Sequence, residues 1–127
     1  MKGTQRKKVP DGPYSELYKD GTLAAEGQMA GGRKTGLWRY HFKDGRLRAE
    51  GAYDADQFTG FWFWNRAGGG RLQEGSFENN LQTGPWKRWH DNGKQLDEGD
   101  WRAGKRVGEW RTYDKAGKLK KTQKFKG

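Results

Sequence analysis

Residues 36–53 read GLWRYHFKDGRLRAEGAY, and this stretch decides the fold. Its aromatic residues Trp38, Tyr40 and Phe42 alternate with polar ones, which is the period of a half-buried β-strand. Asp44-Gly45 then offers residues that tolerate the positive φ of a tight hairpin turn. A second strand follows up to Tyr53. The stretch therefore predicts one β-hairpin.

The hairpin recurs at a constant period of 24 residues. One glycine column holds the phase throughout, at Gly12, Gly36, Gly60, Gly84 and Gly108. Two residues after each stands a large ring: Tyr14, Trp38, Trp62, Trp86 and Trp110. A second glycine column, each member preceded by Glu, stands at Gly27, Gly51, Gly75 and Gly99. Because one hairpin is marginal alone, the repeats must pack against their neighbours, as solenoid repeats do.

These columns predict an all-β protein. We expect an elongated antiparallel β-meander of about five 24-residue hairpin repeats, forming a single-layer twisted sheet. The repeats start at 12, 36, 60, 84 and 108 and form one domain over residues 12–127, behind a flexible basic N-terminal arm over 1–11. The glycine columns are expected to mark bends or a close approach of two strands. Turn-rich linkers such as Gly31-Gly32 are expected to join the hairpins.

Composition narrows the function classes. The 127 residues include no Cys, which excludes disulfides and thiolate chemistry, and the apolar surface is carried by 7 Trp, 5 Tyr and 6 Phe. No apolar run is long enough for a membrane span, and no secretory signal is visible, so we expect a cytoplasmic protein. The isolated His41 and His90 form no catalytic or metal-binding motif. The sequence predicts no enzyme, no cofactor and no metal site, and the recurring Glu column favours a structural role.

The net charge of +10 lies entirely at the two ends, because the 16 acidic residues between Asp11 and Asp114 are balanced by 16 basic ones. This suggests contacts with an anionic membrane surface or nucleic acid. The alternatives are a solubility tail or protection of an edge strand against pairing. The basic C-terminal end spans residues 115–127. The candidate residues at the two ends are Lys7, Lys8, Lys118, Lys120, Lys121 and Lys124.

The third and fourth repeats are richest in rings and supply the best localised candidate site. A single-layer sheet has two faces, so adjacent rings in Phe61–Trp64 point to opposite sides and one pair is left exposed or covered by a partner. The alternative is that the Trp column is core. The partner-binding candidates are Phe61, Trp62, Phe63, Trp64, Trp86, Arg88 and Trp89.

The blocks Gly36-Leu37-Trp38, Asp44-Gly45-Arg46-Leu47 and Glu50-Gly51-Ala52-Tyr53 resemble the MORN repeat, in the bacterial variant found in YwqK-type antitoxin-like proteins. The resemblance covers residues 12–125 and implies a twisted β-meander that serves as a binding scaffold. Relatives are linked to protein partners and, in eukaryotic MORN proteins, to phospholipid membranes. A fainter similarity to choline- and glucan-binding hairpin repeats is opposed by the 24-residue period and the missing export signal.

Together these observations predict a non-catalytic binding scaffold whose favoured partner is a protein, with an antitoxin- or immunity-like role against a toxin as the most concrete form. The alternative is binding of an anionic lipid surface or nucleic acid through the lysine-rich ends. A small-molecule substrate is not expected. The two edge strands leave open pairing with a second copy of the chain.

Overall fold

A computed structural model describes residues 9–126 of the 127-residue chain. Lys7, Lys8 and most of the predicted N-terminal arm lie outside the described residues. Val9 packs against the cluster of Ala25, Met29 and Trp38 in the first repeats, so contacts with the sheet begin before the first strand.

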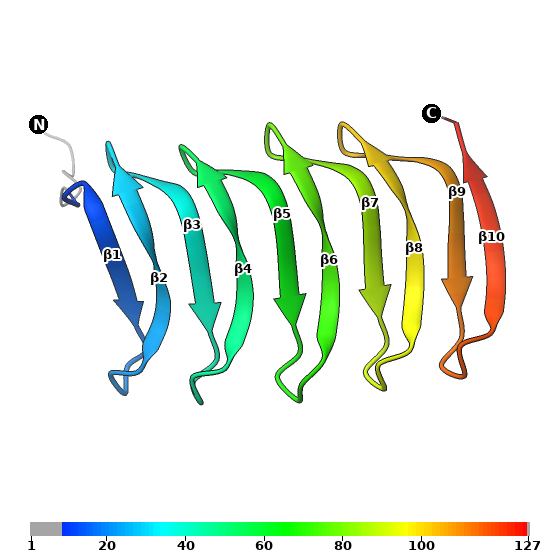
Figure 1. The fold of residues 1–127 in the computed structure, drawn as a ribbon, viewed down its shortest axis with the longest axis horizontal. Helices are drawn as coiled ribbons and strands as arrows, with labels where there is room; N and C mark the ends of the chain where they lie inside the picture. The colour runs from blue at the N-terminus through cyan, green and yellow to red at the C-terminus, as the bar shows by residue number, and fades with distance from the viewer. Residues whose placement is uncertain (1–8, 127) are drawn as a thin grey trace, which may run out of the picture.

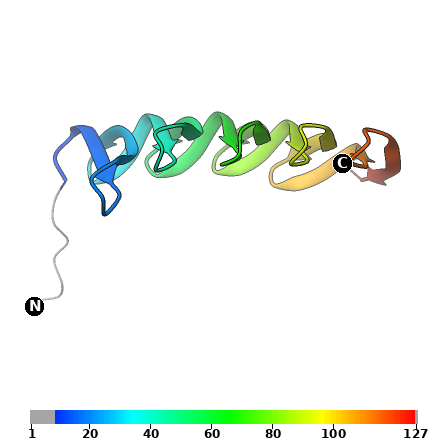
Figure 2. The same ribbon diagram turned by 90° about the horizontal axis from the view of Figure 1, so that it is seen from below.

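The described chain is one ten-stranded antiparallel sheet in which every strand pairs with its neighbours in sequence (Figure 1). Viewed from below, the hairpins follow one another along a single long axis in one thin layer (Figure 2). This confirms the predicted all-β meander. The strands are β1 (Gly12–Leu17), β2 (Leu23–Ala30), β3 (Arg33–His41), β4 (Leu47–Asp54), β5 (Gln57–Asn65), β6 (Arg71–Glu78), β7 (Leu81–Trp89), β8 (Gln95–Arg102), β9 (Lys105–Tyr113) and β10 (Leu119–Phe125).

The predicted hairpin turn at Asp44-Gly45 is present, but it follows the prediction only in part. At Asp44-Gly45 only the glycine has positive φ, at 91°, while the Asp44 carboxylate accepts the backbone N–H of Arg46. Two consecutive left-handed residues occur instead in the segments expected to be linkers, for example Ala55 (φ 49°) and Asp56 (φ 71°) between β4 and β5. Such turns match the twist of the flanking strands, so the expected linkers are the tightest hairpins.

Each odd-numbered strand from β3 to β9 carries a bulge at its Gly-x-Trp segment. Between β4 and β5, Ala52 pairs with Thr59 and Glu50 with Phe63, so the one residue between them on β4 faces three on β5. Gly60 lies in this bulge at φ 70°, a conformation that glycine adopts without strain. The bulge bends the strand and turns the Trp62 ring back over the preceding strand.

The returning ring closes on the second glycine column, and we call this contact the Trp–Gly latch. Trp62 covers Gly51 so closely that a Cβ there would lie 2.0 Å from the indole Cδ2. Its indole N–H donates to the carbonyl of Ala52 at 2.9 Å. The expectation that two strands approach at this column was therefore wrong: the close neighbour is a ring. The same latch joins Trp38 to Gly27, Trp86 to Gly75 and Trp110 to Gly99.

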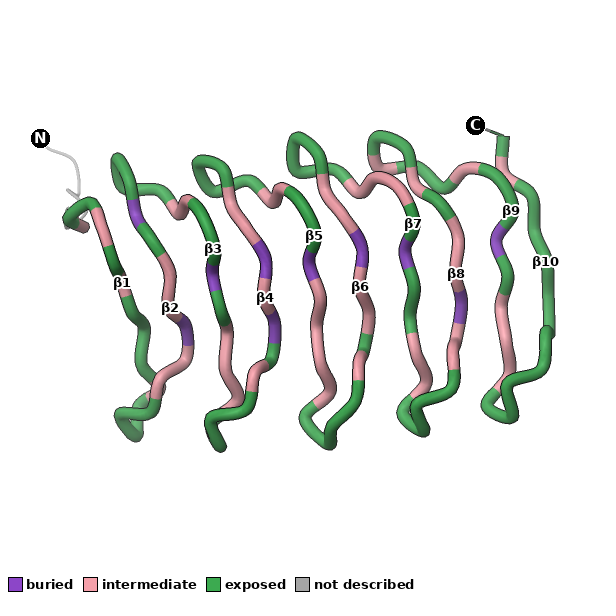
Figure 3. Tube along the Cα trace, in the orientation of Figure 1, coloured by how far each residue is buried: buried purple, intermediate pink, exposed green. Residues whose placement is uncertain are grey.

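The latches place the core in a line along the middle of the sheet (Figure 3). The indoles of Trp38, Trp62, Trp86 and Trp110 are all buried. In β10 the position of the acceptor glycine is held by Gln123. The latch column thus ends within the last repeat.

Candidate functional site

Two rows of rings run along the latched face of the sheet. The first row links neighbouring rings at centroid distances of 5.7 to 6.4 Å through Tyr14, Trp38, Tyr40, Trp62, Trp64 and Trp86. The second row, Tyr53, Phe58 and Phe77, meets the first edge-on. Offset and edge-to-face pairs of this kind stabilise a core beyond the area that they bury.

Both rows stop at the same strand, β7. Arg88 stands where the first row needs its next ring, and Gln82 stands where the second row needs one. The rings resume with the pair Trp101 and Trp110, 5.6 Å apart. We call this interruption, which is formed by Gln82, Arg88, Asp97 and Arg106, the polar break. In the second repeat the corresponding positions hold Tyr40, Ala49, Tyr53 and Phe58, whereas the fourth repeat holds Arg88, Asp97, Trp101 and Arg106.

An ion pair fills the centre of the polar break. Arg88 donates from Nε to both carboxylate oxygens of Asp97, at 3.0 and 3.2 Å, and from Nη2 to Oδ2 at 2.5 Å. The Asp97 side chain is 7% exposed and that of Arg88 46%, so one charge is enclosed and the other reaches solvent. The hydrogen bonds that Arg88 donates to Asp97 raise the pKa of Arg88 above its ordinary value.

Beside this pair the structure has a cavity of about 140 Å³ between β6 and β9. The polar groups that line it are Gln73, Gln82, Arg88, Asp97 and Arg106. Its aromatic walls are Trp86, Trp101 and Trp110. A concave site with aromatic walls and a few convergent polar groups is the usual form of a binding site.

The predicted partner-binding residues are divided between several environments. Trp62 and Trp86 are buried in latches, and Trp64 stacks between them in the first row. Of the seven candidates, Trp86 and Arg88 line the cavity.

The other three candidates lie apart from the cavity. Phe61 is 54% exposed, and Phe63 lies beneath the Arg71 guanidinium, 4.1 Å from its ring centroid. Trp89 is half-buried, and its carbonyl accepts a hydrogen bond from Arg66 at 2.9 Å.

Sequence reasoning missed the other polar residues of the cavity, as well as Trp101 and Trp110. Gln73, Gln82, Asp97 and Arg106 each occupy a column in which another repeat has an apolar residue. The departure of one repeat from its own column was the available signal. This signal was missed because the repeats were compared only for the residues that they share.

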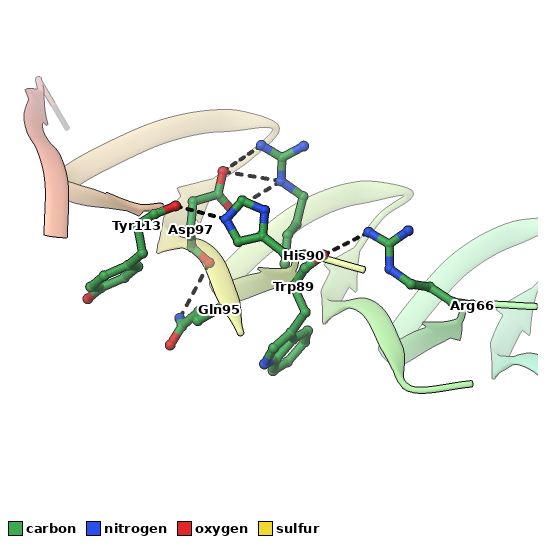
Figure 4. A network of polar contacts seen from close by, with 7 residues as sticks. Arg66, Trp89, His90, Gln95, Asp97 and Tyr113 are labelled. Atoms are coloured by element: carbon green, nitrogen blue, oxygen red, sulfur yellow. Dashed lines mark hydrogen bonds and ion pairs between the residues drawn. The ribbon is translucent and has the colours of Figure 1, made fainter. Parts of the chain in front are cut away.

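The two histidines and two members of the Glu column, Glu26 and Glu98, join neighbouring repeats. His41 Nε2 lies 3.1 Å from the Glu26 carboxylate, and His90 Nε2 lies 2.9 Å from the carbonyl of Tyr113. Figure 4 shows His90 reaching Tyr113 and Arg66 reaching Trp89 in the same way. The Tyr113 hydroxyl donates to Glu98 at 2.7 Å and lowers the pKa of that carboxyl. Among the described residues, no three His, Cys, Asp or Glu side chains gather as metal ligands.

The basic residues of the C-terminal end are exposed. Lys120, Lys121 and Lys124 lie on the edge strand β10, and Lys118 lies in the turn before it. Within residues 9–126, the structure has no helix of the length and apolarity that crossing a membrane requires.

Comparison with family models gives a match at the C-terminal end of the chain. Residues 106–126, which span most of β9 and β10, match the family model of the MORN repeat variant. No curated protein matches the chain. MORN repeats are generally binding or scaffold modules, so a binding role without catalysis fits the matched repeat. The other four repeats share its glycine and aromatic columns.

Proposed function

We propose that this protein is a non-catalytic scaffold that binds another protein across the latched face of its sheet. The observation that carries the proposal is the polar break. A repeat protein that only had to fold would be served by continuing both rows of rings. Beside the cavity, however, Arg88 stands in the column of Tyr40 and Trp64, and Gln82 and Arg106 stand in the column of Phe58. A local departure from a repeating core is where a specific site is expected.

The proposed mechanism is steric occlusion. An extended rigid sheet covers a partner surface, and Arg and Trp side chains at the polar break act as anchors, since these residue types dominate interface hot spots. The similarity of the repeat blocks to antitoxin-like proteins makes neutralisation of a toxin the most concrete form of this function. We place the protein in the cytoplasm.

A second candidate function rests on the exposed lysines of β10. Lys120, Lys121 and Lys124 present positive charge along one edge and could contact an anionic membrane surface or nucleic acid. The same lysines would also keep the edge strand from pairing with other strands. This second account does not use the polar break.

The test is a pull-down from the native host at low and high salt, with and without nuclease, read by mass spectrometry. Two variants are compared with the wild type: Arg106→Gln at the polar break and the triple variant Lys120→Gln, Lys121→Gln, Lys124→Gln. One protein retained at high salt, and lost only in Arg106→Gln, supports the scaffold. Recovery of nucleic acid or lipid alone, lost at high salt and in the triple variant, contradicts it.

A further inference from the structure

We propose that the polar break is a carboxylate-binding pocket, in which Arg106 takes up the anionic group and Trp101 and Trp110 hold the apolar carbon next to it. The pocket is argued from its own residues. It rests on the proposed function only in naming a protein as the carrier of the carboxylate.

Arg106 is a cation without an anion. Its guanidinium carbon lies 4.5 Å from the ring centroid of Trp110 and 5.7 Å from that of Trp101. Among residues 9–126 it makes no ion pair, whereas Arg39, Arg46, Arg71, Arg88 and Arg111 each have a carboxylate partner. Arg106 is exposed, so its donors are open to a ligand.

The charges that line the cavity leave one positive charge uncompensated. They are the cations Arg88 and Arg106 and the single anion Asp97. Both carboxylate oxygens of Asp97 already accept hydrogen bonds from Arg88, so the negative charge of Asp97 compensates the positive charge of Arg88. A cationic ligand would meet Arg106 and find no free carboxylate in the cavity lining. The electrostatics therefore select an anion.

The shape of the pocket selects a carboxylate with an apolar neighbour. A guanidinium binds a planar carboxylate through two parallel hydrogen bonds. The amides of Gln73 and Gln82 add donors to the cavity lining, while the indoles offer apolar walls. A volume of about 140 Å³ suits a single side-chain or terminal group.

The first repeat provides a matched control. Lys34 occupies the column of Arg106, and its ammonium lies 4.8 Å from the ring centroid of Trp38, in the manner of Arg106 over Trp110. There, however, the column position of Arg88 is Glu16, that of Asp97 is Ala25, and Lys34 donates to the Tyr40 hydroxyl at 3.1 Å. If a cation over a ring were sufficient for binding, both positions would bind a carboxylate.

The experiment is a titration of the full chain, followed by the indole N–H resonances of Trp86, Trp101 and Trp110 in NMR spectra. The probes are N-acetyl-phenylalanine, which carries a terminal carboxylate, and N-acetyl-glutamate α-amide, which carries a side-chain carboxylate. N-acetyl-phenylalanine amide is the neutral match, and inorganic phosphate tests selectivity. We expect saturable shifts with one or both carboxylates, and the tighter of the two identifies the source. We expect none with the amide and weaker binding of phosphate.

The variants separate the proposal from a general effect of charge. Arg106→Gln should weaken carboxylate binding about tenfold, as loss of a charge-assisted bond does, and Lys34→Gln should leave it within about twofold. Binding of the amide equal to that of the acid, equal loss in both variants, or the absence of any saturable shift overturns the carboxylate pocket. If the probes fail while a protein is still retained in the pull-down, the pocket is wrong and the scaffold stands.

Discussion

The second and fourth repeats share one backbone and one latch but differ in what surrounds the latch. Around Trp62 the second repeat supplies Tyr40, Tyr53 and Phe58, all in contact with that indole. The corresponding positions around Trp110 hold Arg88, Trp101 and Arg106. Both arrangements complete the same strands and turns. The comparison teaches that the latch carries the fold, while the surrounding positions are open to other uses.

The largest effect is expected where the latch itself is removed. Trp62→Ala deletes a ring that is 1% exposed, and we expect a loss of about 3–5 kcal/mol in the free energy of unfolding, measured in urea. Trp110→Ala should cost a similar amount despite its polar surroundings. The exposed Phe61→Ala is the control and should change stability by less than about 0.5 kcal/mol. A small cost at either indole would show that the latch does not carry the fold.

The ion pair should break asymmetrically. Arg88→Ala leaves the enclosed Asp97 carboxylate without its partner, and we expect a cost of about 2–4 kcal/mol. Asp97→Ala leaves Arg88 without its partner, but the Arg88 side chain is already partly exposed to water. The free energy of unfolding should therefore fall by only about 1 kcal/mol. Urea unfolding of both single variants measures the difference. Equal costs would mean that Asp97 is less enclosed than the structure has it.

The smallest effect on stability is expected at a contact to the Glu column. A tyrosine makes this contact near one end of the sheet and a histidine makes it near the other. Tyr113 donates to Glu98, as His41 contacts Glu26 three repeats earlier. Because the bond lowers the pKa of Glu98 in the folded state, its contribution is present above the ordinary value of 4.5 and is lost as the pH falls through the folded value. Tyr113→Phe should cost about 0.5 kcal/mol at neutral pH.

The free energy of unfolding of Tyr113→Phe and of the wild type, measured in urea at a series of pH values, tests this pH dependence. The two curves should converge in acid, and a constant gap between them down to pH 2 would contradict the assignment of the bond to the ionised carboxyl.

Much of the fold could be predicted because its columns recur. The alternation in residues 36–53 and the 24-residue period define the strands and their order. The position of the turn at Asp44-Gly45 was predicted, but its type was not, because Asp-Gly suits both a two-residue turn and the wider turn found there. The latch partner was missed since sequence spacing does not say that a bulge at Gly60 turns Trp62 back over Gly51. Trp86 and Arg88 were predicted as site residues, while Arg106 was not.

The most direct measurement is the stability of a fourth repeat that carries the residues of the second: Arg88→Tyr, Asp97→Ala, Trp101→Tyr and Arg106→Phe combined. If the polar break serves binding and not folding, the free energy of unfolding should stay equal or rise, because rings replace an ion pair that costs desolvation. Carboxylate binding should disappear in the same variant. A loss of more than about 2 kcal/mol would show that the ion pair is part of the core, and would contradict the account.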